Sequence, residues 1–292
     1  TSDVNIWAAG DGVETPNTVL GTLELAPLAG PANRQGRVAA ENICGRDTEY
    51  KSTQGTSIVK VFDMVAGGTG ATERQLKAAG RDYDSVHVHP SGHAGYYPGA
   101  KRISMLVVFE PGTGKLLGAQ AVGEDGVDKR IDVIATAIFG GLTVDDLMDL
   151  ELSYSPQYGS AKDPINHAGY VGNNVNTGRT PTFQWHELDA ELAKPNTILV
   201  DVRTAAENQA GTTPNSINIS VVCAASRTIC AQPTGGLSSI KAEDTTLEEL
   251  SATPSALLEM ADKLLDPISD LSSTRSGPRT KPRLANRFDF LR

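Results

Sequence analysis

The sequence has no complete glycine-rich loop of the kind that holds nucleotide phosphates. In the stretch at residues 111–115, Phe109 stands where the first glycine of a P-loop belongs and Leu116 follows the lysine, so we expect a hairpin turn there. Residues 67–70 do not continue to the third glycine of a dinucleotide-binding fingerprint, and we interpret them as a bend at a strand end. The chain starts with Thr1, so we expect it to be cut from a longer protein whose amino-terminal half is missing.

Cysteines and long apolar runs are also scarce. Cys44, Cys223 and Cys230 have neither the density of a disulfide scaffold nor a zinc-binding spacing, which favours a reducing compartment and a cytoplasmic location. No stretch approaches the roughly 20 apolar residues of a membrane helix, so no membrane partner is expected. The net charge of −9 argues against a nucleic-acid partner. His87 and His89 share a face of a predicted strand without a third ligand, so no metal site is expected.

The 292 residues, 39% of them hydrophobic, are enough for two modules and have the composition of a soluble globular protein. Residues 5–14, NIWAAGDGVE, predict a short buried strand that ends near Asp11. On this motif alone Asp11 is equally a turn residue, but a carboxylate there can also accept hydrogen bonds from the hydroxyls of a polyol chain. Residues 25–44 predict a helix with Pro31 in its first turn, and the amides at a helix start suit an electron-rich ring edge.

Residues downstream of Gly55 change to a pattern of strands and turns. Strands are expected at residues 56–65, 84–89, 102–110 and 116–123, with a helix at residues 72–80. Apolar residues then recur at helical spacing at Ile131, Ile134, Ala135 and Ile138. Thr143 and Asp146 resemble a capping box. Strands followed by packed helices predict an α+β domain built on a mainly antiparallel sheet.

A linker and a second module follow. Residues 172–181, GNNVNTGRTP, are rich in Asn, Gly and Thr and predict the linker. The next segments predict a small α/β module, in the order helix, strand, loop and strand, at residues 183–195, 197–203 and 216–220. Beyond Cys230 the pattern weakens to one amphipathic helix at residues 257–265 and a basic tail from Ser272 that we expect to be disordered.

Several segments occur in a characteristic order over residues 3–174: AAGDGVE, PLAGPANRQGRVAAENI, GTSIVKVFD, GYYPGAKRISMLVVFEPGTGKLLGAQAVG and SYSPQYGSAKDPINHAGY. They resemble the carboxyl half of the coenzyme A disulfide reductases, flavoenzymes of the pyridine nucleotide disulfide oxidoreductase superfamily. The resemblance implies the end of an FAD-binding α/β domain in residues 1–54 and an antiparallel-sheet dimerisation domain with helices in residues 55–174. It also implies a homodimer in which this domain completes the active site of the partner subunit.

The same resemblance implies two cofactors and a substrate. The cofactors are FAD and NAD(P)H, and the substrate is coenzyme A disulfide or a related persulfide. In the family a Gly-Asp motif binds the ribityl chain of the flavin, and a helix start abuts the flavin ring. The matching residues of this chain are Gly10, Asp11, Leu28, Ala29, Gly30 and Pro31.

Two tyrosine clusters, YYPG at residues 96–99 and SYSPQY at residues 153–158, read without context as loop and core-packing residues. The family uses one tyrosine from each cluster to act on the coenzyme A thiolate. The matching residues are Tyr97, with Tyr96 as its alternative, and Tyr154. A neutral phenol can donate a hydrogen bond or a proton to a departing thiolate. The alignment also places His93 and Lys162 at the substrate, where an ammonium group suits the phosphates of coenzyme A.

After a linker at residues 175–182, residues 183–240 resemble a partial rhodanese domain, and residues 241–292 hold the amphipathic helix and the basic tail. A working rhodanese needs an arginine five positions after its cysteine, whereas Arg227 follows Cys223 by only four, so sulfur transfer is not expected. The chain also lacks the redox cysteine that the family carries in its flavin domain. The alternative hypothesis is therefore a non-catalytic dimerisation module or one that binds a sulfur carrier.

Overall fold

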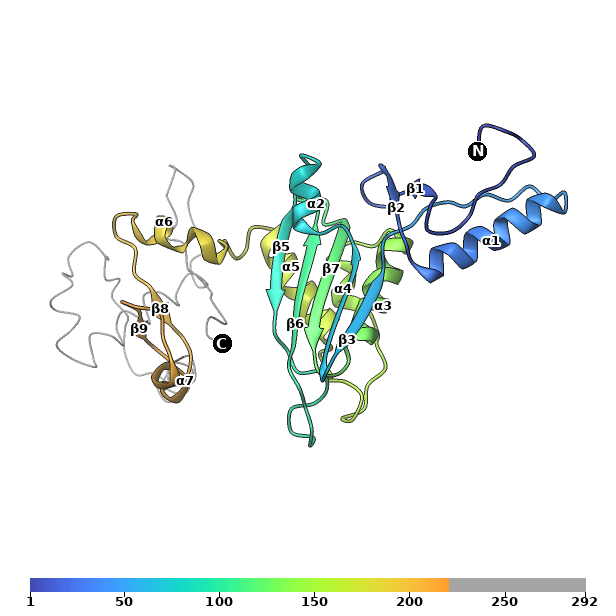
Figure 1. Ribbon diagram of the computed structural model, residues 1–292. Helices are drawn as coiled ribbons and strands as arrows, with labels where there is room; N and C mark the ends of the chain where they lie inside the picture. The colour runs from blue at the N-terminus through green and yellow to red at the C-terminus, as the bar shows by residue number, and fades with distance from the viewer. Residues whose placement is uncertain (221–292) are drawn as a thin grey trace, which may run out of the picture. The chain divides into compact units, whose positions relative to one another are not determined.

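The computed structural model describes residues 1–220, which fall into two compact units (Figure 1). The first comprises Thr1–Thr180, and the second begins at Pro181. The expectations for Cys223, Cys230, the helix at residues 257–265 and the basic tail lie outside the described residues. No helix within residues 1–220 is long and apolar enough to cross a membrane.

A five-stranded antiparallel sheet forms the centre of the first unit, which confirms the predicted α+β architecture. Its strands are β3 (Ser57–Val61), β4 (Met64–Gly70), β5 (Asp84–Val88), β6 (Ile103–Phe109) and β7 (Leu116–Gly123), in the order β3-β4-β7-β6-β5. The single strand predicted at residues 56–65 was wrong, because the chain reverses there as the β3–β4 hairpin. Phe62 takes a φ of 52° at this turn, a conformation that an apolar pattern does not signal.

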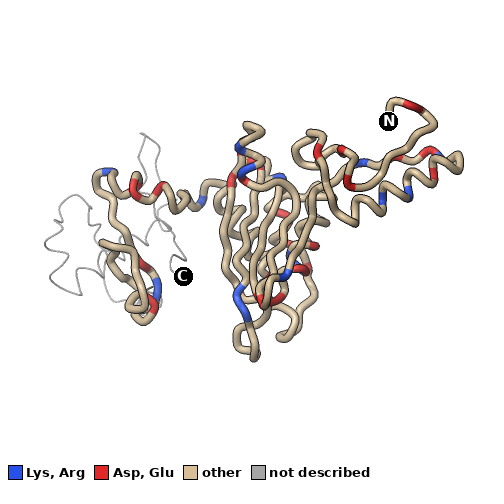
Figure 2. Tube along the Cα trace, viewed as in Figure 1, with Lys and Arg blue, Asp and Glu red and all other residues tan. Residues whose placement is uncertain are grey.

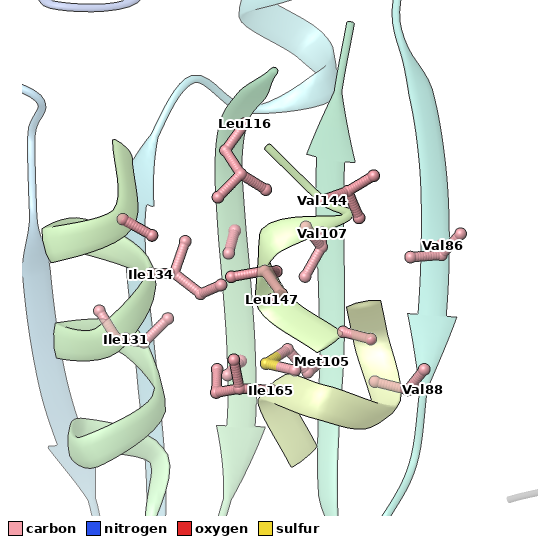
Figure 3. Close-up of a cluster of buried hydrophobic side chains, with 14 of the residues drawn as sticks. Val86, Val88, Met105, Val107, Leu116, Ile131, Ile134, Val144, Leu147 and Ile165 are labelled. Atoms are coloured by element: carbon pink, nitrogen blue, oxygen red, sulfur yellow. The ribbon is translucent and has the colours of Figure 1, made fainter. Parts of the chain in front are cut away.

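Three helices cover one face of the sheet and bury the main core (Figure 3). They are α3 (Val127–Gly140), α4 (Asp146–Asp149) and α5 (Pro164–Asn176). The predicted helical repeat is confirmed, since Ile131, Ile134 and Ile138 are all buried against the sheet. The predicted capping box is also confirmed. The Asp146 carboxylate accepts from the Thr143 amide at 2.7 Å, and the Asp146 amide donates to the Thr143 hydroxyl. The short α2 (Glu73–Ala78) follows β4 as predicted.

The bend at a strand end that was predicted for residues 67–70 is wrong for Gly67 and Gly68, which lie within β4, whereas Gly70 is the last residue of that strand. Gly67 and Gly68 pair with β7 in regular register. A Cβ on Gly67 would lie 3.0 Å from the Ile131 side chain, so the missing side chain lets α3 pack closely on the sheet. Gly70 has a φ of 71°, which only glycine adopts without strain.

We expect Gly70→Ala to lower the free energy of unfolding by about 1–3 kcal/mol, because an L-residue there is strained and its Cβ would collide with the Leu117 carbonyl oxygen. Urea unfolding of the full chain measures the loss. The matched control is Gly68→Ala on the same strand, where the nearest atom is 3.4 Å away. Equal losses in the two variants would contradict this explanation.

Residues 5–14 do not form the predicted buried strand. The side chains of Ile6 and Trp7 are exposed, and only the last residue of the segment enters a strand, β1 (Glu14–Pro16), which pairs with β2 (Leu23–Leu25). An apolar run becomes a strand only where neighbouring strands supply partners, and no described strand lies beside residues 5–9. The predicted helix is confirmed as α1 (Ala29–Ile43), with Cys44 at its carboxyl cap.

The linker predicted at residues 172–181 starts too early, because α5 continues to Asn176. Gly172 is buried in that helix, where a Cβ would collide with Val144 and lie 3.5 Å from Phe109. Gly172 is therefore needed for close packing between helix α5 and its neighbours. The polar residues that follow it at the end of the helix caused the wrong prediction of a linker.

The second unit contains short elements. They are the 3-10 turn η1 (Trp185–Glu187), α6 (Leu188–Leu192), β8 (Val200–Asp201), α7 (Ala205–Ala210) and β9 (Ile217–Asn218). β8 and β9 pair in parallel, and α7 replaces the loop that the sequence predicted between them. Asp201 accepts hydrogen bonds from Arg203 and Asn208, which hold the pKa of its carboxyl well below the ordinary range.

Acidification should therefore destabilise this unit through Asp201. A carboxyl whose pKa is depressed on folding contributes stability that is fully present above the unfolded pKa of about 4 and is lost as the pH falls below it. We expect the free energy of unfolding of this unit, followed in urea by the amide NMR signals of β8 and β9, to fall as the pH is lowered from 6 to 2, and Asp201→Asn to flatten this pH dependence. Asp189→Asn, at an exposed position, is the control. An identical pH response in the Asp201 variant would refute the assignment.

Candidate functional site

Two loops that carry the candidate tyrosines lie side by side in the first unit. One runs between β5 and β6 and holds Tyr96, and the other precedes α5 and holds Tyr154. Both extend beyond the same end of the five-stranded sheet, the lower end in Figure 1. The Ala94 amide donates to the Gly159 carbonyl at 2.9 Å and so ties the loops together. The two phenol oxygens are 3.0 Å apart, within hydrogen-bond distance.

This phenol pair is open to solvent and electrostatically neutral. Tyr96 is 77% exposed and Tyr154 is 50% exposed. The hydrogen bond with Tyr96 raises the pKa of Tyr154 above the ordinary value. A phenol with a raised pKa keeps its proton at neutral pH, so the pair can present an O–H donor to an approaching anion.

Tyr97 occupies a different environment from Tyr96. Its ring meets the ring of His93 edge to face, with the centroids 5.9 Å apart. His93 is buried, and its Nδ1 lies 3.2 Å from the Ala94 carbonyl oxygen. The structure therefore brings the three candidate tyrosines and His93 together. The hydrogen bond to Tyr154 is made by Tyr96 and not by Tyr97.

Lys162 provides positive charge at the edge of the same region. Its side chain is exposed, and its Nζ lies 5.2 Å from the centroid of the Tyr170 ring, a cation–π contact. Burial, together with the nearby Lys162 charge, lowers the pKa of His167. A lowered pKa favours the neutral form of His167, so Lys162 is the charged member of this pair at neutral pH. Acidic and basic residues are otherwise interspersed along the described chain (Figure 2).

A buried ion pair lies beneath the two loops, and sequence reasoning missed it. Arg130 and Asp163 are 1% and 3% exposed, and the guanidinium donates to both carboxylate oxygens, at 2.8 and 3.3 Å. The sequence contains a feature that could have indicated each of the two residues. Arg130 falls on the apolar face of α3, between Val127 and Ile134, where a charge requires a partner. Asp163 precedes Pro164 at a helix start, and it caps α5.

The candidate flavin residues form a second group, around the start of α1. The Gly10 amide donates to the buried Gln35 side chain at 2.8 Å, which fixes the Gly10–Asp11 turn beside the helix. Asp11 is exposed, and α1 begins after Leu28 without a side-chain cap. Within the described chain this group is not brought together with the tyrosine loops (Figure 1).

His87 is exposed on β5, and the His89 Nδ1 lies 3.0 Å from the Ser104 hydroxyl. Cys44 is an exposed free cysteine at the end of α1. Among residues 1–220, no three His, Cys, Asp or Glu side chains gather closely enough to hold a metal ion.

The sheet, its helices and the two loops together form a recognisable domain. Residues 56–163 match the family model described as the pyridine nucleotide-disulphide oxidoreductase dimerisation domain. The matched range contains β3 to β7, both tyrosine loops and the Arg130–Asp163 pair.

Curated relatives of this dimerisation domain include enzymes named coenzyme A disulfide reductase. The protein from Staphylococcus epidermidis is 40% identical over 171 residues, which cover 58% of this chain and 39% of the relative. A Staphylococcus aureus protein of the same name matches equally well. The chain thus spans about two fifths of the length of the curated relatives it matches.

Two solved structures share the fold over more of the chain. The reduced Bacillus anthracis protein CoADR-RHD superposes with a TM-score of 0.74 at 48% identity and covers 78% of this chain and 41% of that one. The NAD-dependent persulfide reductase of A. fulgidus superposes with a TM-score of 0.69 at 38% identity, and the match covers 76% of this chain and 40% of that one. Since Thr180 ends the first unit of the 292-residue chain, both likenesses extend into the second unit.

Proposed function

We propose that this chain is part of an FAD-dependent enzyme that uses NAD(P)H to reduce coenzyme A disulfide or a related persulfide. The observation that carries the proposal is the Tyr96–Tyr154 phenol pair, held 3.0 Å apart on two loops of a matched dimerisation domain. The relatives named coenzyme A disulfide reductase and the solved NAD-dependent persulfide reductase support the reaction class.

The phenol pair suits the step in which a disulfide is cleaved. Reduction of a disulfide by two electrons breaks the S–S bond and releases two thiols, so each departing thiolate needs a proton. Like any phenol, Tyr154 keeps its proton at neutral pH, and it can donate a hydrogen bond or the proton to that sulfur. Lys162 would pair with the phosphates of the coenzyme A portion, and His93 supports the loop through Tyr97.

The donor set around α1 fits part of a flavin site. The Asp11 carboxylate is exposed and can accept hydrogen bonds from the hydroxyls of a ribityl chain. The first-turn amides that follow Leu28 have no side-chain cap and can face the electron-rich edge of a ring. The residues proposed to hold the cofactor are Gly10, Asp11, Leu28, Ala29, Gly30 and Pro31. Bound flavin would supply two-electron transfer from the nicotinamide.

For the second unit we propose a rhodanese-like module. Its helix, parallel β8–α7–β9 unit and Asp201–Arg203 ion pair are consistent with a small α/β fold, and the 78% coverage by the Bacillus anthracis structure supports the same assignment. We also propose that the first unit assembles as a homodimer through its dimerisation domain.

A chimera tests the function directly. The aligned 171-residue segment of the Staphylococcus epidermidis enzyme is replaced by the corresponding segment of this chain, which supplies the tyrosine loops to a complete flavin domain. We expect NADH- or NADPH-dependent release of free thiol from coenzyme A disulfide. A chimera that binds flavin and is reduced by the nicotinamide but releases no thiol would reject the proposal and favour a non-catalytic dimerisation module.

A further inference from the structure

Arg130 uses its whole guanidinium group to join three segments. Its Nη2 donates to the Gly92 carbonyl at 2.6 Å and to the Asp163 carboxylate at 2.8 Å, and its Nη1 donates to the Gly126 carbonyl at 3.2 Å. Gly92 belongs to the first tyrosine loop, and Asp163 ends the second. A single buried side chain on α3 therefore holds both loops.

Lys129, the neighbour of Arg130, extends this network to the second tyrosine. Its Nζ lies 3.6 Å from an Asp163 carboxylate oxygen and 3.4 Å from the Ser153 carbonyl oxygen. Ser153 immediately precedes Tyr154 in the chain.

Three of the groups that the network binds are each one residue away from a candidate site residue. Gly92 adjoins His93, Ser153 adjoins Tyr154, and Asp163 adjoins Lys162. Stability alone does not require this arrangement, because a buried ion pair adds little over well-packed apolar side chains of similar size. An ion pair does, however, fix geometry through directional hydrogen bonds, and the arginine fork is rigid and planar.

We propose that Arg130 and Asp163 are positioning residues, which set the spacing of the two loops so that the phenols of Tyr96 and Tyr154 meet. The inference rests on the proposed function, because it assigns the network to the same site. It adds a specific cause for the pairing of two exposed tyrosines on loops that are 58 residues apart in sequence.

The test removes both charges together in the full chain, as Arg130→Met with Asp163→Asn. Asparagine can still cap α5, and neither partner is left as an unpaired buried charge. Tyrosines are replaced by 3-fluorotyrosine, whose phenol ionises at lower pH, and are followed by ¹⁹F NMR as the pH rises. Single Tyr→Phe variants assign the signals. We expect the pKa of Tyr154 in the parent chain to lie above that of free 3-fluorotyrosine, and to lose this upward shift in the double variant.

Tyr96→Phe provides the reference, because it deletes the hydrogen bond directly, and the double variant should reproduce its effect on Tyr154. Leu116→Ala is the matched stability control. Leu116 is buried at the far end of β7 from the loops, so this variant should unfold more easily and leave the Tyr154 titration unchanged. If a folded double variant keeps the same Tyr154 pKa as the parent chain, the proposal is overturned.

If the double variant does not fold, Arg130→Lys carries the test. Lysine keeps a charge for Asp163 but lacks the fork that also reaches Gly92, so the upward shift of Tyr154 should shrink, and an unchanged shift overturns the proposal. The rate of thiol release by the chimera is a separate measurement. If the titration responds while thiol release does not, the positioning role stands and the catalytic role of the tyrosines fails.

Discussion

Tyr154→Phe in the chimera is expected to slow thiol release from coenzyme A disulfide by about 100-fold or more, which corresponds to about 2.7 kcal/mol of transition-state stabilisation. The reason is that the thiolate-leaving step alone uses the phenol. Reduction of the flavin by the nicotinamide cofactor should proceed at the parent rate. Stopped-flow absorbance measures the two half-reactions separately, so the variant should affect one and spare the other.

Tyr96→Phe should have a smaller effect than Tyr154→Phe, since its phenol acts by holding the Tyr154 proton through the 3.0 Å hydrogen bond. Tyr97→Phe keeps the ring that packs on His93 and should be nearly neutral. Tyr158→Phe, at an exposed position of the same loop as Tyr154, is the matched control and should also be neutral. Equal slowing of both half-reactions by Tyr154→Phe would indicate a packing role and remove the phenol from the chemistry.

The choice between Tyr96 and Tyr97 shows where sequence reasoning stops. The resemblance placed Tyr97 at the substrate with Tyr96 as its alternative, because the two tyrosines are adjacent in one motif. Side chains of neighbouring loop residues point in different directions, and a loop has no fixed periodicity from which to infer them. Only the folded chain reveals that one ring packs on His93 while the other meets Tyr154.

The sheet and helices were more predictable, because alternation and helical spacing report burial directly. Ile131, Ile134 and Ile138 identified the buried face of α3 correctly. Failures occurred where the decisive partner is distant in sequence. In the sequence Gly67 looks like a turn residue, but in the structure Ile131 of α3 packs against it. Gly172 looks like a linker residue, but Val144 packs against it. These glycines serve close packing between elements, which local composition does not encode.

Arg130 was overlooked for a related reason. A pattern that scores apolar residues passes over a charged residue on the same face, although a charge at such a position is informative because it is costly to bury alone. Its partner Asp163 lies 33 residues away in the sequence, beside Lys162. Pairing the unexplained charge on a buried helix face with a capping acid elsewhere is the inference that would have found this network.

The energetic consequence of that burial is large. We expect Arg130→Met alone to lower the free energy of unfolding by about 3–5 kcal/mol, because it leaves the Asp163 carboxylate buried without its main partner. Lys129, 3.6 Å away, offsets part of this loss, which places the expected value toward the lower end of that range. Urea unfolding of the full chain, followed by circular dichroism with a check that the m-value is unchanged, measures it. Lys101→Met is the control, since its ion pair with Glu124 is about half exposed and solvent-screened and should contribute little.

Combining Arg130→Met with Asp163→Asn separates the cost of an orphaned charge from the value of the pair. Were the two residues independent, their losses would add, whereas an orphaned charge is created by the first change and removed by the second. We therefore expect the double variant to be more stable than Arg130→Met alone, with the methionine side chain filling part of the buried volume that the arginine leaves. A double variant no more stable than Arg130→Met alone would mean that the loss comes from the other hydrogen bonds of Arg130, to the carbonyls of Gly92 and Gly126, and not from the orphaned Asp163 charge. A double variant that is stable but has lost the Tyr96–Tyr154 pairing would show that the ion pair serves the geometry of the two loops and not the stability of the fold.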